Sequence, residues 1–328
     1  MDKSVDQLIH SLNDVIDSGQ PLNVTEYFTS FSLYFMLNVV FDIEVGELSK
    51  FKHPIITSYK KFIHKKITLS QSICFVHPVL TRILNLYFLS YKSIGKLREI
   101  LENAIKTRDY KKETEIRTEI NFIDILLSFE SEFGDKDSSE WTQPSLPIHQ
   151  LITHLITTYS DHKTGLTSQE IKDNLIALFI AATESIAKTL SYCIYFLANN
   201  TDIQEKAFNE VCDKIKIQEN INWESLRELS YMEAFIKEVL RFTTPFPRFE
   251  RIVKKDFHLE TEEFGKIFLP KDSIVSVLAS AVHMDGQYFK DPDVFNPNRF
   301  LPEYQHLMNP MAFIPFANGP RNCIGQFN

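Results

Sequence analysis

Glycine, cysteine and long apolar runs are all scarce in this chain of 328 residues. Only 9 glycines accompany 27 phenylalanines, a balance that favours helices packed on aromatic cores. The most apolar continuous run, residues 31–41, is about half of the roughly 20 residues that a membrane-spanning helix needs. Residues 1–20 are acidic and polar rather than basic and then apolar. The sequence therefore predicts neither a signal peptide nor a membrane anchor in this chain.

An excess of basic charge and a metal-binding cysteine pattern are also missing. The net charge is −8, which argues against broad nucleic-acid binding and against a polybasic membrane patch. The four cysteines (Cys74, Cys193, Cys212 and Cys323) form no C-x-x-C pair and show no zinc spacing. A reducing compartment without disulfides is the simplest interpretation. The histidines, His149 and His154 included, show no paired metal spacing, and we interpret them as structural.

The apolar periodicity that is present is mainly helical. Helices are predicted over residues 5–16, 24–40, 55–110 with a break near 77–78, 122–129, 166–200, 199–211 and 231–242. Short β-rich runs at 251–253, 266–269 and 273–278 predict a small sheet. Residues 134–147 are polar, contain two prolines and predict a loop. The fold class expected is mainly α with a small β portion, in one large domain or two ordinary ones.

The longest predicted helix, 166–200, changes character halfway along. Thr167 and Glu170 form a capping-box signature at its start, and residues 175–182 are apolar on every side. Thr183, Glu184 and Ser185 then interrupt the apolar run. A serine there can bond the carbonyl four residues back and bend the helix. A polar patch near the surface and a functional break in a buried helix fit this pattern equally well.

Four charged residues further on are weak signals when each is taken alone. Glu238 and Arg241 lie three apart on the polar face of the helix 231–242, where such a pair contributes little to stability. Arg248 follows two prolines that end this helix, and Arg299 would by itself be an exposed turn residue.

The last stretch, residues 313–327 with the sequence FIPFANGPRNCIGQF, holds a lone cysteine in a tight loop. Gly319 and Gly325 permit backbone angles that other residues resist, and the prolines stiffen the approach. Arg321, two residues before Cys323, favours the thiolate over the thiol. A thiolate can ligate a metal, haem iron included. The alternative is an ordinary buried or free cysteine, as most single cysteines are.

This loop resembles the cysteine-ligand loop of the cytochrome P450 family, the haem-thiolate monooxygenases, whose pattern is F-G-x-G-x-R-x-C-x-G. Three further segments resemble the family in the same order: the A-G-x-D/E-T pattern of the long helix, E-x-x-R, and P-E-R-F. The matching residues are Ala181, Thr183, Glu184, Glu238, Arg241, Pro297, Arg299, Phe300, Phe316, Gly319, Arg321, Cys323 and Gly325. Because four motifs occur in order, chance is a poor explanation.

Several positions depart from the family patterns. Ala317 and Ala182 each replace a glycine, Ser185 replaces a threonine, Asn298 replaces a glutamate and Thr201 stands where proline is usual. Ser185 keeps a hydroxyl that can deliver a proton, although its geometry is less fixed than that of threonine. Ala182 is expected to narrow the oxygen groove that the resemblance implies beside the long helix.

The resemblance implies a partial cytochrome P450 domain over residues 1–328. Residues 1–165 would form its amino-terminal helices, and residues 166–328 the long oxygen-side helix, the E-x-x-R helix, the small sheet and the ligand loop. It also implies family segments before residue 1, including a membrane anchor, and a helix after residue 328. For a full-length eukaryotic relative it implies the endoplasmic reticulum membrane.

The roles implied by the resemblance fall into three groups. Cys323 would be the axial ligand of haem b, with Phe316 packed beside the thiolate. Arg248 and Arg321 would hold the haem propionates, because a guanidinium pairs well with a carboxylate. Glu184 and Ser185 would relay protons to bound oxygen. Glu238, Arg241 and Arg299 would form a buried structural network behind the ligand loop.

The function implied is insertion of one atom of O₂ into a small apolar organic substrate, with electrons from an NADPH-dependent reductase. The alternative is a truncated, inactive family member without stable haem binding, because ancestry is not activity. A third hypothesis is a regulatory protein that uses Cys323 as a reactive thiol without haem.

Overall fold

The computed structural model describes residues 2–19, 21–39, 168–215 and 223–326, with the single helical residues Tyr59, Gly95, Arg98, Glu99 and Glu102. The chain divides into two compact units, residues 1–187 and 188–328. This division falls inside a helix. The single partial domain over residues 1–328, with portions 1–165 and 166–328, stays a prediction. The predicted helix 122–129, the predicted loop 134–147 and most of 55–110 lie outside the described residues.

The first unit begins with two helices, α1 (Asp2–Ser18) and α2 (Val24–Val39), which contact each other. Gly19, at a φ of +65°, ends α1, and the Asn23 side chain accepts the Glu26 amide at 3.3 Å where α2 begins. Leu33 and Leu37 of α2 are fully buried. Both helices agree with the sequence prediction. Helix α2 is buried because it carries apolar residues on most of its sides.

The long helix α9 (Ser168–Asn199) continues from the first unit into the second. In the first unit its buried side chains lie at helical spacing on one face: Leu175, Ile176, Phe179, Thr183 and Ala187. The helix therefore buries one stripe, whereas the sequence predicts burial on every side of residues 175–182. Residues 173–199 are also long and apolar enough to cross a membrane, a property that core helices of soluble proteins share.

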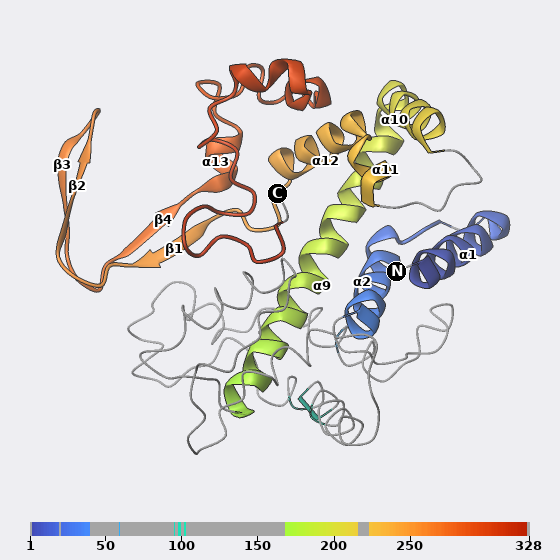
Figure 1. Ribbon diagram of the computed structural model, residues 1–328, viewed down its shortest axis with the longest axis horizontal. Coiled ribbons are helices and arrows are strands. Elements are labelled where there is room, and N and C mark those ends of the chain that lie inside the picture. Colours follow the sequence, from blue (N-terminus) through green and yellow to red (C-terminus); the bar gives the residue numbers. More distant parts are fainter. Residues whose placement is uncertain are drawn as a thin grey trace. The chain divides into compact units, whose positions relative to one another are not determined.

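The second unit has an aromatic core around α12 (Ser230–Phe242), which contacts α10 (Thr201–Lys214) (Figure 1). A short helix, α11 (Trp223–Arg227), precedes α12. Phe196 of α9 stacks on Phe295 with ring centroids 4.0 Å apart and planes within 5°. Phe235 and Val239 of α12 complete this cluster with Ile203 of α10. Burial of these large side chains holds α12 in place.

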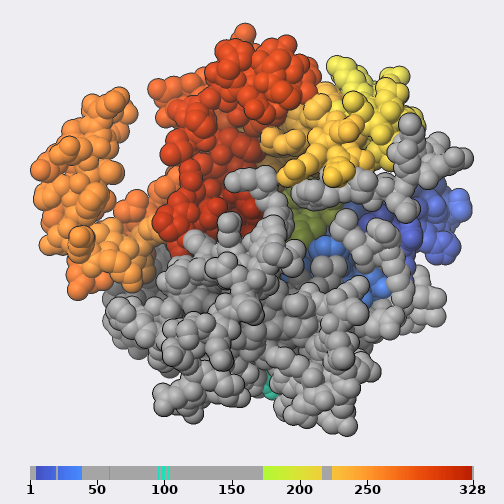
Figure 2. Space-filling view, in the orientation of Figure 1, coloured from blue at the N-terminus to red at the C-terminus, as the bar shows by residue number. Residues whose placement is uncertain are grey.

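Two antiparallel strand pairs follow α12. Strand β1 (Phe249–Ile252) pairs with β4 (Ile274–Val277), and β2 (Phe257–Thr261) pairs with β3 (Gly265–Leu269). Figure 2 shows the β2–β3 hairpin projecting from the rest of the second unit. Strand β2 is absent from the sequence prediction, although Phe257 and Leu259 alternate with polar residues; the run is short and its side chains are mostly exposed.

The chain between β4 and the cysteine is built from short elements: α13 (Ala279–His283) and two 3-10 helices, Pro297–Phe300 and Pro302–Leu307. Phe289, Phe300 and Ala312 are buried here against Ala234 of α12. This second cluster fixes residues 283–313 on α12, so α12 supports the segment that leads to Cys323.

Candidate functional site

The loop that carries Cys323 is closed by backbone hydrogen bonds. The amide of Cys323 donates to the carbonyl of Phe316 at 2.8 Å, and the amide of Ala317 donates to that of Ile314 at 3.2 Å. Gly319 has a φ of +83°, the left-handed region that favours glycine. The tight loop that the sequence predicts is thus a series of turns. A backbone hydrogen bond within it joins Cys323 to Phe316.

Ala317, where the family pattern has glycine, also lies in the left-handed region, at a φ of +60°. This backbone angle makes the replacement unfavourable, because an L-residue in the left-handed region costs about 1–2 kcal/mol. The loop is thus formed against a local conformational preference.

Cys323 is an exposed free thiol in this structure. A side chain added at Gly325 would place its Cβ 3.9 Å from the Cys323 sulfur, an ordinary contact distance. The described residues contain no group of three or more histidine, cysteine, aspartate or glutamate side chains that could hold a metal ion. A single thiolate on a preset, accessible loop suits haem, whose iron needs only one axial ligand from such a loop. The residues present fit that group.

Arginines are found on this loop, in contact with it and on the neighbouring strand segment that begins with Arg248. Arg321 belongs to it, and the guanidinium of Arg251 donates to the Arg321 carbonyl at 3.4 Å. Arg248 is instead paired with Glu250, whose carboxylate is 3.0 Å away, and both side chains are nearly half exposed. Such an exposed pair is weak, so the guanidinium can exchange Glu250 for another carboxylate. Arg251 is not among the predicted site residues. In the sequence it stands out only as the first residue of the β-rich run 251–253.

The structure brings Glu238, Arg241 and Arg299 together in the second unit. Glu238 and Arg241 are almost fully buried, at 0% and 1% exposure, although the pattern by itself suggests a surface pair. Arg241 donates to both carboxylate oxygens of Glu238, from Nε at 2.7 Å and from Nη2 at 2.9 Å. Arg299 adds a third bond, from its Nε to Glu238 Oε1 at 3.1 Å. The ion pair is thus bidentate, the strongest arrangement of a guanidinium and a carboxylate.

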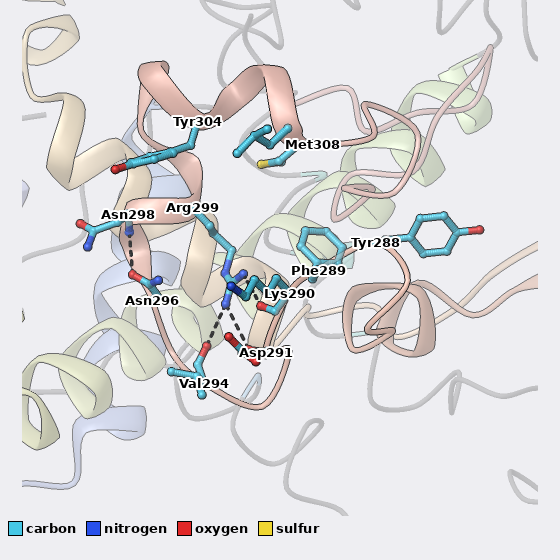
Figure 3. Close-up of a pocket in the computed structure, with 11 residues that line it drawn as sticks. Tyr288, Phe289, Lys290, Asp291, Val294, Asn296, Asn298, Arg299, Tyr304 and Met308 are labelled. Carbon is cyan, nitrogen blue, oxygen red and sulfur yellow. Dashed lines mark hydrogen bonds between the residues drawn. The ribbon is translucent and has the colours of Figure 1, made fainter.

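Two guanidinium groups face one carboxylate, and backbone carbonyls satisfy the remaining donors. Arg241 Nη1 donates to the His283 carbonyl at 2.7 Å and Nη2 to that of Pro292 at 2.9 Å. Figure 3 shows Arg299 reaching the carbonyls of Lys290 and Val294, at 2.9 and 3.1 Å. The buried charges are therefore hydrogen bonded on all sides, which a buried ion pair requires.

A pocket of about 400 Å³ lies over Arg299 (Figure 3). Its lining includes Tyr288, Asn298, Tyr304 and Met308. Among the predicted site residues only Arg299 contributes to it, and that guanidinium is already engaged by Glu238 and by carbonyls. The pocket is consequently a feature of the segment that precedes the ligand loop rather than a place for the predicted chemistry.

His283, the last residue of α13, is a second omission of the sequence prediction, which treats it only as structural. It is fully buried, and its Nε2 accepts the amide of Ile314 at 3.0 Å. Burial, together with the charge of Arg241, lowers the pKa of His283 to about 4, so the ring is neutral near pH 7. No spacing signal could have revealed this contact, because Ile314 is an ordinary apolar residue 31 positions away.

Glu184 and Ser185 lie on α9 in the first unit. The Ser185 hydroxyl donates to the carbonyl of Ala181 at 2.8 Å and lies 3.2 Å from that of Ala182, the back-bonding that the sequence suggests. The hydroxyl of buried Tyr59 lies 3.5 Å from Glu184 Oε1. Burial, and then the charge of Glu184, raise the pKa of Tyr59 above its ordinary value. The polar interruption of α9 is thus a group of oxygen-bearing side chains beside a buried tyrosine.

Comparison with known proteins adds an independent line of support. The sequence model of the family described as Cytochrome P450 matches residues 1–327. Cytochrome P450 3A15 of Cavia porcellus is 26% identical over 324 residues, which cover 98% of this chain and 58% of that protein. Cytochrome P450 3A2 of Rattus norvegicus is 27% identical over 326 residues, with the same coverage of both chains. The chain thus spans 58% of the length of these curated relatives.

Proposed function

Because this chain belongs to the cytochrome P450 family, we propose that it provides the haem-ligating part of a haem-thiolate monooxygenase. Members of this family hold haem b through an axial cysteine thiolate, and the bound haem supplies the activation of O₂. The proposed reaction inserts one oxygen atom into a small apolar organic substrate. The electron donor would be an NADPH-dependent reductase, at the endoplasmic reticulum if the protein resembles eukaryotic relatives.

The observation that carries this proposal is the conformation of the cysteine loop. Cys323 offers an accessible sulfur while its amide is tied to Phe316 at 2.8 Å, so the thiol is held by the backbone rather than by its own side-chain contacts. Phe316 would pack beside the thiolate. Arg321 and Arg248 would bind the haem propionates, Arg248 after giving up its exposed bond to Glu250.

The test of the ligand is the carbon monoxide difference spectrum of the reduced protein, expressed with added haem precursor. We expect a strongly red-shifted Soret band in the wild-type chain and its loss in Cys323→Ser. Cys212, which is also exposed, provides the matched control, because Cys212→Ser should keep the band. Identical spectra for the wild type and Cys323→Ser would overturn the proposal and favour an inactive family member or a thiol-based regulatory protein.

For proton delivery we propose Glu184 and Ser185. The Ser185 hydroxyl donates to a helix carbonyl, so it can accept a proton from one side while it passes its own to the other after rotation. Ser185→Ala should reduce product formed per NADPH consumed by about tenfold or more, as loss of a positioned proton donor does. Ser185→Thr should retain it, and the carbon monoxide spectrum should be unchanged in both variants. Unaltered coupling in Ser185→Ala would remove this residue from the proton path.

A further inference from the structure

His283 makes hydrogen bonds both to the buried charge cluster of Glu238, Arg241 and Arg299 and to Ile314, in the segment that leads to Cys323. Its backbone carbonyl accepts Arg241 Nη1 at 2.7 Å. Its ring nitrogen Nε2 accepts the Ile314 amide at 3.0 Å. The side chain has no exposed surface. One residue thus connects Glu238, Arg241 and Arg299 to the chain that leads to Cys323.

From Ile314 the connection continues by backbone hydrogen bonds. The Ile314 carbonyl accepts the Ala317 amide at 3.2 Å, which forms the first turn of the loop. Phe316, inside that turn, accepts the Cys323 amide at 2.8 Å. The position of the sulfur therefore depends on the Phe316 carbonyl, and the turn that holds this carbonyl starts at the amide bound by His283.

We propose that His283 is a positioning residue for the cysteine ligand: its neutral imidazole fixes the Ile314 turn and, through it, the Cys323 thiol against the Glu238–Arg241–Arg299 cluster. The consequence for haem rests on the proposed function above. The consequence for the loop does not, because every contact that carries it lies within the chain itself.

The surroundings of the ring favour this role over that of a simple space-filling side chain. Phe313 stacks on the imidazole at a centroid distance of 5.6 Å, and Phe289 meets it edge-on at 6.2 Å. Nδ1 is buried and has no hydrogen-bond partner among the described residues. An unpartnered buried nitrogen opposes stability, so a phenylalanine would fill this site at least as well. What a phenylalanine lacks is an acceptor for Ile314.

The ring must be neutral to accept that amide, because a charged imidazole has two donors and no acceptor. The charged group that faces His283 is Arg241, from α12, and its positive charge disfavours a second cation beside it. Consistently, the pKa of His283 lies well below its ordinary value, at about 4. The acceptor is thus available across the physiological pH range.

Three substitutions separate the acceptor from the shape of the side chain. His283→Phe keeps the ring and removes the acceptor. His283→Gln can place an amide oxygen near the position of Nε2, whereas the shorter His283→Asn corresponds to Nδ1 and cannot reach Ile314. We expect His283→Gln to behave as the wild type and the other two variants to share one defect.

The first measurement is amide hydrogen exchange of the full chain without haem. In His283→Phe and His283→Asn, protection of the Ile314, Ala317 and Cys323 amides should fall about tenfold relative to α12 amides. Alkylation of Cys323 should change rate in the same variants, with Cys212 as the internal reference. Equal losses across α12 and the loop, or no loss, would reduce His283 to a structural residue and overturn the proposal.

The second measurement is the reduced carbon monoxide spectrum of the haem-loaded protein. His283→Phe and His283→Asn should show a smaller fraction of the red-shifted, thiolate-ligated form at equal haem content, and His283→Gln should restore it. A wild-type chain without any red-shifted band would contradict the proposed function while the exchange experiment still decides the role of His283. An unchanged fraction in His283→Phe would overturn the proposal itself.

Discussion

At the scale of single residues, Ala317 shows how a small replacement stores conformational energy. Its φ of +60° places an L-residue where glycine is favoured. Ala317→Gly should raise the free energy of unfolding by about 0.5–1 kcal/mol, because relief of the left-handed backbone exceeds the entropy that glycine gains when unfolded. Urea denaturation of both proteins measures this difference.

The matched control is Ala198→Gly, at an exposed position near the end of α9 with ordinary helical geometry. There the same substitution should lower the free energy of unfolding by about 0.5–1 kcal/mol. A change of the same sign at both positions would mean that Ala317 is not strained in the folded protein.

Glu238 is the residue whose charge the buried cluster depends on. Glu238→Gln keeps its size but leaves Arg241 and Arg299 without an anion, so the free energy of unfolding should fall by about 3–5 kcal/mol. Glu233→Gln on the same helix is the control, since Glu233 pairs with Lys237 at an exposed site and should change stability by less than about 1 kcal/mol. Similar losses in the two variants would contradict the assigned importance of burial.

The lowered pKa of His283 should make the free energy of unfolding depend on pH. The folded pKa is about 4, whereas an unfolded histidine titrates near 6.5, so only the unfolded chain binds a proton here between these values. The contribution is complete above about pH 6.5 and decreases as pH falls towards 4, by about 2 kcal/mol at pH 5. The urea midpoint at pH 7.5 and 5 should differ less in His283→Gln than in the wild type. Parallel pH profiles for the two proteins would refute this assignment.

At the scale of elements, α12 begins with a cap that comes from another helix. Its own N-cap residue, Leu229, has no side-chain hydrogen bond. Glu210 of α10 instead accepts the amides of Tyr231 at 2.7 Å and Met232 at 2.8 Å, and the Ser230 hydroxyl at 3.2 Å. The negative charge of this carboxylate also interacts favourably with the positive N-terminal end of the helix dipole. Glu210 therefore joins α10 to α12 as well as capping α12.

Loss of this cap should weaken α12 at its start. Glu210→Ala is expected to lower the free energy of unfolding by about 1–2 kcal/mol, the range for removing a helix cap. Thermal denaturation followed by circular dichroism would measure it. Glu205→Ala, an exposed position on the same helix, should have almost no effect. If both variants melt alike, the hydrogen bonds of Glu210 contribute nothing beyond those of water.

At the scale of the whole molecule, local patterns predict local structure well. The long helix predicted at 166–200 is α9 at Ser168–Asn199, and the helix predicted at 231–242 is α12 at Ser230–Phe242. Periodicity identifies them because each buries a stripe along its own length. Strand β2 escapes prediction because its pairing with β3, rather than burial, defines it.

The site is less predictable because its contacts join distant residues. The pattern E-x-x-R cannot show that Glu238 is buried, since the amide of Asn296 and the side chain of Arg299, which cover it, lie 58 and 61 positions away. The pairing of Arg248 with Glu250 and the contact of His283 with Ile314 have no signature in the sequence either. The resemblance to a family directs attention to Glu238, Arg248 and Arg299, but nothing in the sequence directs attention to His283.

The distances along the chain within the charge cluster have a consequence for the order of folding. Glu238 and Arg241 meet as soon as α12 forms, but the carbonyls of His283 and Pro292 are 42 and 51 residues from Arg241. The entropic cost of closing a loop changes slowly with its length. The costs of closing these two loops and the 61-residue loop from Glu238 to Arg299 therefore differ by only about 0.3 kcal/mol. No one of these contacts has a clear kinetic lead. We expect Arg241 to stay hydrated until residues 283–299 dock together, so the contacts that support the segment carrying Cys323 should form in that same step.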